Sequence, residues 1–171
     1  MSNKIWEFTG ETKIHLGTTL KRIRAAVGFE LKCGVVIGKG ELGGWIEKES
    51  NLYGNAWVSG NAKVYGDAEV SGNAWVSGDA EVYGNARVYG NAWVSGNAEV
   101  KSSEDYCVYK NTWSSFRWFT YTRSNKMWSV GCFHGTGAEL IARAYKDSEK
   151  SGKCYEAIVK AQEAIEKEME V

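Results

Sequence analysis

Aliphatic, small and polar residues follow a six-residue pattern that runs from residue 46 to residue 99 without an insertion. Each of the nine units begins with an aliphatic residue and carries a small one, alanine in eight units and Ser50 in the first, at its fifth position. Eight units place Gly-Asn or Gly-Asp between these two positions. The aliphatic and small residues are expected to point inward, and the Gly-Asn or Gly-Asp pair suits the turned backbone of a corner. Three corners close a turn of eighteen residues, so the pattern predicts a parallel β-helix of about three turns over residues 46–100.

The segment before the coil has a different pattern. Short strand-like runs at residues 5–8, 18–25 and 31–37 are separated by glycine-rich turns. A solenoid exposes backbone groups and apolar core at its first turn, so a terminal segment has to cover them. We therefore expect residues 1–45 to form a β cap.

The segment after the coil, residues 101–171, is predicted to be a small domain of β-β-β-α-α order. The three expected strands span residues 106–110, 117–123 and 126–132. Thr136 and Glu139 have the spacing of a helix capping box, and a second helix is expected from about residue 151 to residue 168. The fold class is thus mainly β, with a helical pair at the C-terminal end.

The repeat resembles that of the hexapeptide-repeat proteins, whose coils are left-handed parallel β-helices. The resemblance covers about a third of the chain and implies a left-handed coil; it is weak for function, because that fold hosts many activities. The whole chain, including K-N-T-W-S-S-F-R-W-F-T-Y-T-R-S-N-K-M-W (residues 110–128) and G-C-F-H-G-T-G (residues 131–137), also resembles uncharacterised hexapeptide-repeat proteins of phages and prophages. This second resemblance implies a genomic setting and no particular chemistry.

Residues eighteen positions apart should stack on one face of the coil. Trp57, Trp75 and Trp93 have this spacing, and a row of serines runs beside them. Burying three indoles is worth several kcal/mol, so this strip should be covered by the C-terminal region or by another subunit. We expect a subunit interface, with a trimer favoured, because coils of the resembling family commonly pack about a threefold axis.

Charge is segregated along a chain that is neutral as a whole, with 21 Lys and Arg against 21 Asp and Glu. Residues 106–138 contain no Asp or Glu, although they hold four Lys and Arg among nine aromatic residues. In a hairpin turning at Ser124-Asn125, Arg123 would face Lys126 and Tyr121 would face Trp128. Facing cations repel each other, so they either extend into solvent or hold an anion between them.

The second alternative predicts a site for an anionic, ring-containing small molecule. Cations would hold phosphate groups, aromatic rings would stack on the ring, and the start of the first helix would offer further donors. The candidate ligand-binding residues are Arg117, Arg123, Lys126, Tyr121, Trp128, Trp113, His134 and Thr136. Core aromatics with a solvated basic rim, and a structural role for His134 and Thr136, are the competing interpretation.

The sequence favours a non-enzymatic protein without a cofactor or a metal. Acyltransferases with this coil need a histidine base and a loop excursion, whereas residues 46–99 contain no His, no Cys and no insertion. We expect the protein to bind or sequester a nucleotide-like signal of host defence. The alternatives are an inhibitor that binds a host defence protein, a structural phage component and, fourth, a binder of single-stranded nucleic acid, which the neutral net charge does not favour.

The expected compartment is the cytoplasm of the bacterial host, without a membrane partner. The sequence has no apolar run near twenty residues and no signal-like N-terminus. Its four cysteines are widely spaced and include no C-x-x-C pair, so reduced thiols are expected.

Overall fold

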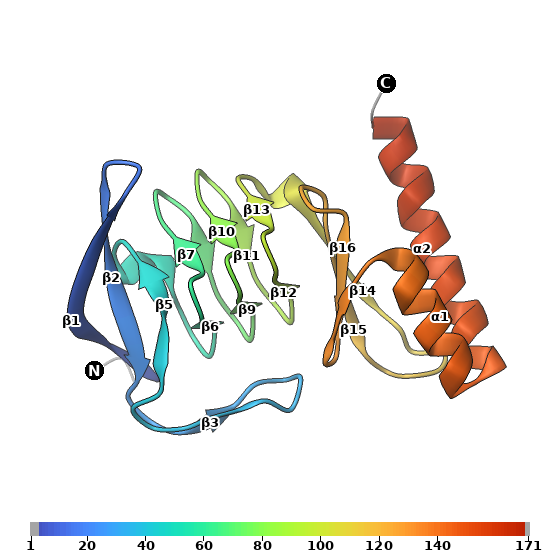
Figure 1. The fold of residues 1–171 in the computed structure, drawn as a ribbon, viewed down its shortest axis with the longest axis horizontal. Coiled ribbons are helices and arrows are strands. Elements are labelled where there is room, and N and C mark those ends of the chain that lie inside the picture. Colours follow the sequence, from blue (N-terminus) through green and yellow to red (C-terminus); the bar gives the residue numbers. More distant parts are fainter. Residues whose placement is uncertain (1–3, 170–171) are drawn as a thin grey trace.

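A computed structural model describes residues 4–169 and shows three parts in a row. The N-terminal cap lies at one end, the coil in the middle and the C-terminal domain at the other end (Figure 1). The expected fold class is confirmed: the chain is mainly β, with a solenoid of about three turns and two C-terminal helices. The left-handed sense of the coil stays a prediction.

The coil consists of short parallel strands on three faces. Its strands are β5 (Leu42–Ile46), β6 (Trp57–Val58), β7 (Lys63–Val64), β8 (Glu69–Val70), β9 (Trp75–Val76), β10 (Glu81–Val82), β11 (Arg87–Val88), β12 (Trp93–Val94) and β13 (Glu99–Val100). One face has the order β5-β7-β10-β13, the second β6-β9-β12 and the third β8-β11. A short 3-10 helix, Glu49–Asn51, begins the third face. Every strand pairs with the strand eighteen residues away, as the repeat predicts.

The interior of the coil is built from the first and fifth positions of each unit. All the valines and alanines at these positions are buried, from Ala56 to Val100. The corners need glycine because adjacent turns approach closely: Gly78 has a φ of 71°, and a Cβ on it would lie 2.9 Å from the carbonyl oxygen of Gly96. Both the inward direction of the apolar residues and the role of the corners agree with the sequence.

The cap extends one sheet of the coil. β1 (Trp6–His15) and β2 (Thr18–Ala25) form an antiparallel hairpin, and β2 pairs with β5. A smaller hairpin, β3 (Phe29–Glu30) with β4 (Val36–Ile37), runs alongside the coil toward the C-terminal domain (Figure 1). The single strand expected at residues 31–37 was wrong, because Gly34 has a φ of 89° and its amide donates to the carbonyl of Leu31, which turns the chain there.

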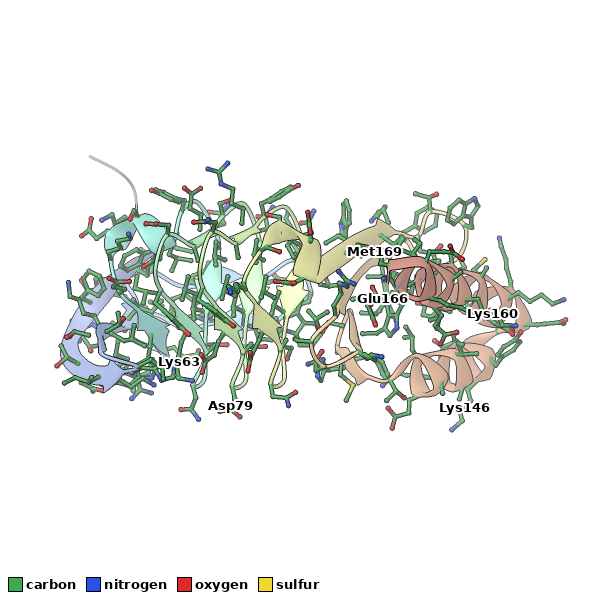
Figure 2. All side chains as sticks on the ribbon, turned by 90° about the horizontal axis from the view of Figure 1, so that it is seen from above. Lys63, Asp79, Lys146, Lys160, Glu166 and Met169 are labelled. Carbon is green, nitrogen blue, oxygen red and sulfur yellow. The ribbon has the colours of Figure 1, made fainter. Side chains whose placement is uncertain are left out.

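The tip of the β1–β2 hairpin contacts the coil through Glu81. Its carboxylate accepts hydrogen bonds from Lys63 Nζ at 2.8 Å and Tyr65 OH at 2.9 Å, and lies 3.0 Å from His15 Nε2. Burial alone would raise the pKa of Glu81, but these three partners together hold it below its usual value. Figure 2 shows Lys63 at the end of the coil that is close to the N-terminal cap.

Replacing Glu81 with glutamine should lower the free energy of unfolding by about 1–3 kcal/mol at pH 7, because charge-assisted hydrogen bonds are lost. A carboxyl with a depressed pKa stabilises the fold above its unfolded value and stops doing so as the pH falls through its folded value. The difference between wild type and Glu81→Gln, measured by urea unfolding, should therefore shrink at pH 3. Glu99→Gln on the same face is the control, since the exposed Glu99 accepts one long bond, at 3.4 Å from Tyr83 OH. A difference of the same size at both pH values would contradict this account.

The C-terminal domain is a four-stranded antiparallel sheet with two helices. After a 3-10 helix at Ser103–Asp105, the strands are β14 (Tyr106–Lys110), β15 (Trp118–Thr122), β16 (Met127–Val130) and β17 (Phe133–Gly135), in that order across the sheet. The helices are α1 (Gly137–Asp147) and α2 (Glu149–Met169). The sequence interpretation missed β17, which forms because Gly131, with a φ of 60°, turns the chain back. The predicted capping box at Thr136 and Glu139 is present.

No helix within residues 4–169 combines the length and the apolar character that crossing a membrane would require.

The tryptophan ladder has the predicted register, and its Trp57 end is covered by this chain. Trp75 and Trp93 stack with centroids 4.7 Å apart, and their Nε1 atoms donate to Ser59 and Ser77. Trp57 is completely buried, and Phe29 of β3 packs edge-on against its ring. The subunit interface expected at Trp57 was therefore wrong, because the cap hairpin covers this indole. For the partly exposed Trp75 and Trp93 a subunit interface stays a prediction.

Candidate functional site

The aromatic pair predicted to stack on a ligand belongs to the hydrophobic core. Tyr121 faces Trp128 across β15 and β16, as expected, with ring centroids 5.0 Å apart. Both are buried in one cluster with Phe119 and with residues of α1 and α2. Burial raises the pKa of Tyr121 to about 12. Stacking of a ligand on Tyr121 or Trp128 was therefore a wrong expectation, because the two helices cover this face of the sheet.

The predicted cation pair at the hairpin tip is not arranged around an anion site. Arg123 Nε lies 3.1 Å from a carboxylate oxygen of Glu166 in α2, and this partner raises the pKa of the guanidinium. In Figure 2, Glu166 lies toward the inner end of α2, whereas Lys160 lies farther out. Lys126 occupies the turn, with a φ of 55°. The protein's own carboxylate thus takes the position that we expected a ligand to fill at Arg123.

His134 and Thr136 also have internal partners. His134 Nδ1 lies 3.0 Å from Ser129 Oγ, its ring packs near Trp93 of the coil, and burial lowers its pKa. The Thr136 hydroxyl accepts from the Glu139 amide, while the Glu139 carboxylate accepts from the Thr136 amide. The start of α1 is therefore occupied by its own acidic residue, and the structural interpretation of both residues fits their contacts.

A cavity of about 250 Å³ lies where the three parts of the chain meet. The cap hairpin contributes Lys32 and Cys33, the coil contributes Asn91 and Trp93, and the C-terminal domain contributes the remaining walls. Those walls are Lys110, Phe116, Arg117, Trp118, Thr120, Ser129 and Gly131. Of the eight predicted ligand-binding residues, Arg117 lines this cavity. We name it the cationic cavity.

The cationic cavity has three positive side chains and no negative one. Lys32, Lys110 and Arg117 are all exposed, and no Asp or Glu is among the lining residues, which all lie in the described range. Lys110 Nζ lies 5.0 Å from the ring centroid of Trp118 and donates to the carbonyl of Phe116. The Arg117 side chain passes close to Gly131: a Cβ added to Gly131 would lie 3.4 Å from Arg117 Cδ. Cations beside aromatic rings suit an anion that carries a flat ring.

A loop with several internal hydrogen bonds, between β14 and β15, presents Phe116 and Arg117 to this cavity. Asn111 is buried at the start of the loop, and its Oδ1 accepts from the amides of Trp113 and Ser114. The backbone N–H of Asn111 donates to the carbonyl of Arg117, and this bond closes the loop. Phe116 has a φ of 55°, which is uncommon for a residue with a side chain; Leu16 and Lys126, in two hairpin turns of this chain, have similar values.

Sequence reasoning selected Arg117 and Lys110 as part of an acid-free block but had no means of including Lys32. This lysine is remote in sequence and reaches the cavity only because β3 and β4 run along the coil. Within residues 4–169, no three or more His, Cys, Asp or Glu side chains lie together in a way that could hold a metal ion.

Comparison with known families agrees with the architecture. A family model described as YdcK Beta solenoid repeat matches residues 80–96, which lie in the last turns of the coil. This chain is a β-solenoid repeat protein. Comparison with curated proteins gives no match. The β-solenoid contributes Asn91 and Trp93 to the lining of the cationic cavity, and the fold by itself does not specify a function.

Proposed function

We propose that this β-solenoid protein binds an anionic, ring-containing small molecule of the nucleotide class in the cationic cavity and does not transform it. The observation that supports the proposal is the combination of Lys32, Lys110 and Arg117 with aromatic walls, in a cavity lined by no carboxylate. A guanidinium recognises phosphate oxygens in pairs, and a lysine adds a compact charge. Aromatic side chains contribute by stacking on a flat ring.

The lining residues also favour binding without chemistry. None of them is a His, Asp or Glu, the side chains that most often act as a general base. Arg117 would hold the phosphate, Lys32 and Lys110 would complete the positive wall, and Trp118 would offer its ring beside Lys110. Because the chain has zero net charge, attraction of the ligand depends on this local cluster.

The resemblance to phage and prophage hexapeptide-repeat proteins suggests a biological role for such binding. We propose that the ligand is a signal of host defence and that the protein sequesters it in the cytoplasm of the bacterial host. We further propose that subunits associate through the coil, as a trimer, with the partly exposed Trp75 at the interface, since Trp93 lines the cationic cavity. Sequestration needs only tight binding, which fits a cavity lined by no His, Asp or Glu.

The double variant Lys32→Ala/Arg117→Ala should weaken binding of a nucleotide about a hundredfold, because two charge-assisted contacts are lost. Lys110 is kept because its ammonium holds the Phe116 carbonyl. The affinities for the four ribonucleoside monophosphates should be measured by isothermal titration calorimetry. In parallel, protein purified from a bacterial host should be heat-denatured and the supernatant analysed by mass spectrometry, where wild type is expected to release a nucleotide and the variant none.

The matched control is Lys146→Ala/Lys150→Ala, which removes the same charge from exposed positions that do not line the cavity. Figure 2 shows Lys146 at the end of the molecule away from the coil. The control should bind and release nucleotide as wild type does. Equal affinities for the cavity variant and wild type would overturn the proposed site.

A second candidate function, inhibition of a host protein, is favoured by an apolar groove between β14 and α2. The groove has a volume of about 480 Å³ and is lined by Tyr109, Trp113, Ile158 and other residues. Trp113, 64% exposed, stands at its edge, and exposed tryptophans are enriched in interface hot spots. A protein inhibitor would copurify with a host protein and release no small molecule on heating.

A further inference from the structure

A second cavity adjoins the cationic cavity at Trp118. It measures about 380 Å³ and is lined by Tyr89, Ser103, Tyr106 and Val108 together with Gly90. Asn91 and Trp118 line both cavities. We propose that the two form one bipartite cleft, which places the anionic group of a ligand beside Arg117 and an uncharged ring beside Tyr89. This inference rests on the proposed function and specifies the architecture of the ligand.

The volumes favour a ligand that occupies both cavities. Sites for small molecules usually measure about 300–1,000 Å³. The cationic cavity alone, at about 250 Å³, falls below this range, whereas the second cavity brings the cleft well inside it. A phosphate with its sugar would fill the first cavity, and the ring attached to that sugar would extend past Trp118 into the second.

The charges of the two cavities differ in the way such a ligand requires. Three cations line the first cavity, whereas no lining residue of the second has a charged side chain. An anion is therefore directed to the first cavity, and a neutral ring loses no favourable charge contact in the second. Asn91, at the junction, brings an amide that can both donate and accept a hydrogen bond.

The aromatic walls of the second cavity are held by the coil and the sheet. The Tyr106 hydroxyl donates to the Arg87 carbonyl at 2.7 Å, so this tyrosine offers its ring rather than its hydroxyl to a ligand. Tyr89 is 61% exposed on the third face of the coil, and covering it with a flat ring would remove apolar surface from water. Trp118 lines both cavities and can contact both parts of the ligand.

The coil itself provides a matched pair of variants. Tyr89, Ser71 and Tyr53 occupy equivalent positions in successive turns, so serine is native to this position. Tyr89→Ser removes the ring of the second cavity, whereas Tyr53→Ser makes the same change two turns away, outside the cleft. Arg117→Ala tests the anionic end independently.

Calorimetric titration of these variants with the four ribonucleoside monophosphates and with inorganic phosphate tests the proposal. Tyr89→Ser should bind the preferred nucleotide about tenfold more weakly and inorganic phosphate with unchanged affinity. Tyr53→Ser should match wild type with both probes, and Arg117→Ala should weaken both.

Three results would overturn the bipartite cleft, and they have different consequences. One result is that Tyr89→Ser binds nucleotide with the affinity of wild type while Arg117→Ala binds it more weakly. The second cavity is then unused, and the proposed function stands. If Tyr89→Ser weakens phosphate as much as nucleotide, the substitution acts on the first cavity and no ring is recognised by Tyr89. If wild type binds neither probe, the proposed function fails as well.

Discussion

Replacing Trp128 with alanine is expected to lower the free energy of unfolding of the C-terminal domain by about 3–5 kcal/mol, the cost of removing a large buried side chain. Trp128 is 2% exposed and packs against Tyr121 and Phe119. The first residue of α1, Gly137, lies so close that a Cβ on it would be 3.3 Å from Trp128 Nε1. The Trp128 indole therefore packs between the sheet and the two helices. Urea unfolding followed by circular dichroism would measure how much it contributes to the free energy of unfolding.

Trp113→Ala is the control, because Trp113 was also predicted to stack on a ligand but is 64% exposed. Removing it should cost less than about 0.5 kcal/mol, as for most surface substitutions. The two variants therefore separate a tryptophan of the core from one of the surface. Comparable losses for both, or a loss below about 1 kcal/mol for Trp128→Ala, would contradict the packing described for this domain.

Replacing Gly78 with alanine should destabilise the coil by about 2–5 kcal/mol. A left-handed backbone costs a residue with a side chain about 1–2 kcal/mol, and overpacking adds about 1–3 kcal/mol. Both terms apply to Gly78, whose φ is 71° and whose Cβ would lie 2.9 Å from the Gly96 oxygen. The atoms it would meet are backbone, which cannot move aside without disturbing the next turn. Thermal unfolding monitored by circular dichroism would report the loss.

Gly90→Ala isolates the conformational part of this cost. Gly90 has a φ of 72°, yet a Cβ on it would meet nothing within 4 Å. Only the left-handed backbone should then matter, at about 1–2 kcal/mol. If the two alanine variants unfold at the same temperature, close contact between adjacent turns does not limit the residue type at the corners.

The coil could be predicted in detail because its information is local and periodic. A unit of six residues determines which side chains point inward, and the eighteen-residue spacing determines which ones stack. The ladder of Trp75 and Trp93 was therefore foreseen, and the pairing of their Nε1 atoms with Ser59 and Ser77 follows from the serine row beside it. The face that carries Lys63 and Glu81 follows in the same way.

The candidate site could not be predicted to the same extent because it depends on contacts between distant segments. The hairpin register of Tyr121 and Trp128 was correct, but the sequence did not show that α1 and α2 pack on that side of the sheet. Glu166 lay outside the expected apolar stripe of α2 and nevertheless reaches Arg123. The acid-free composition did identify the right region, since Lys110 and Arg117 line the cationic cavity.

The β3–β4 hairpin makes the geometry of the cationic cavity depend on the number of turns in the coil. Lys32 belongs to the cap and Arg117 to the domain at the other end, so the distance between them is set by the height of the coil. Adjacent parallel strands are about 4.8 Å apart. Insertion or deletion of one eighteen-residue turn would preserve every repeat and yet displace the two cations by about that distance. A change in repeat number that the fold tolerates would thus separate the walls of the cavity, and the proposed binding function requires the number of turns that this chain has.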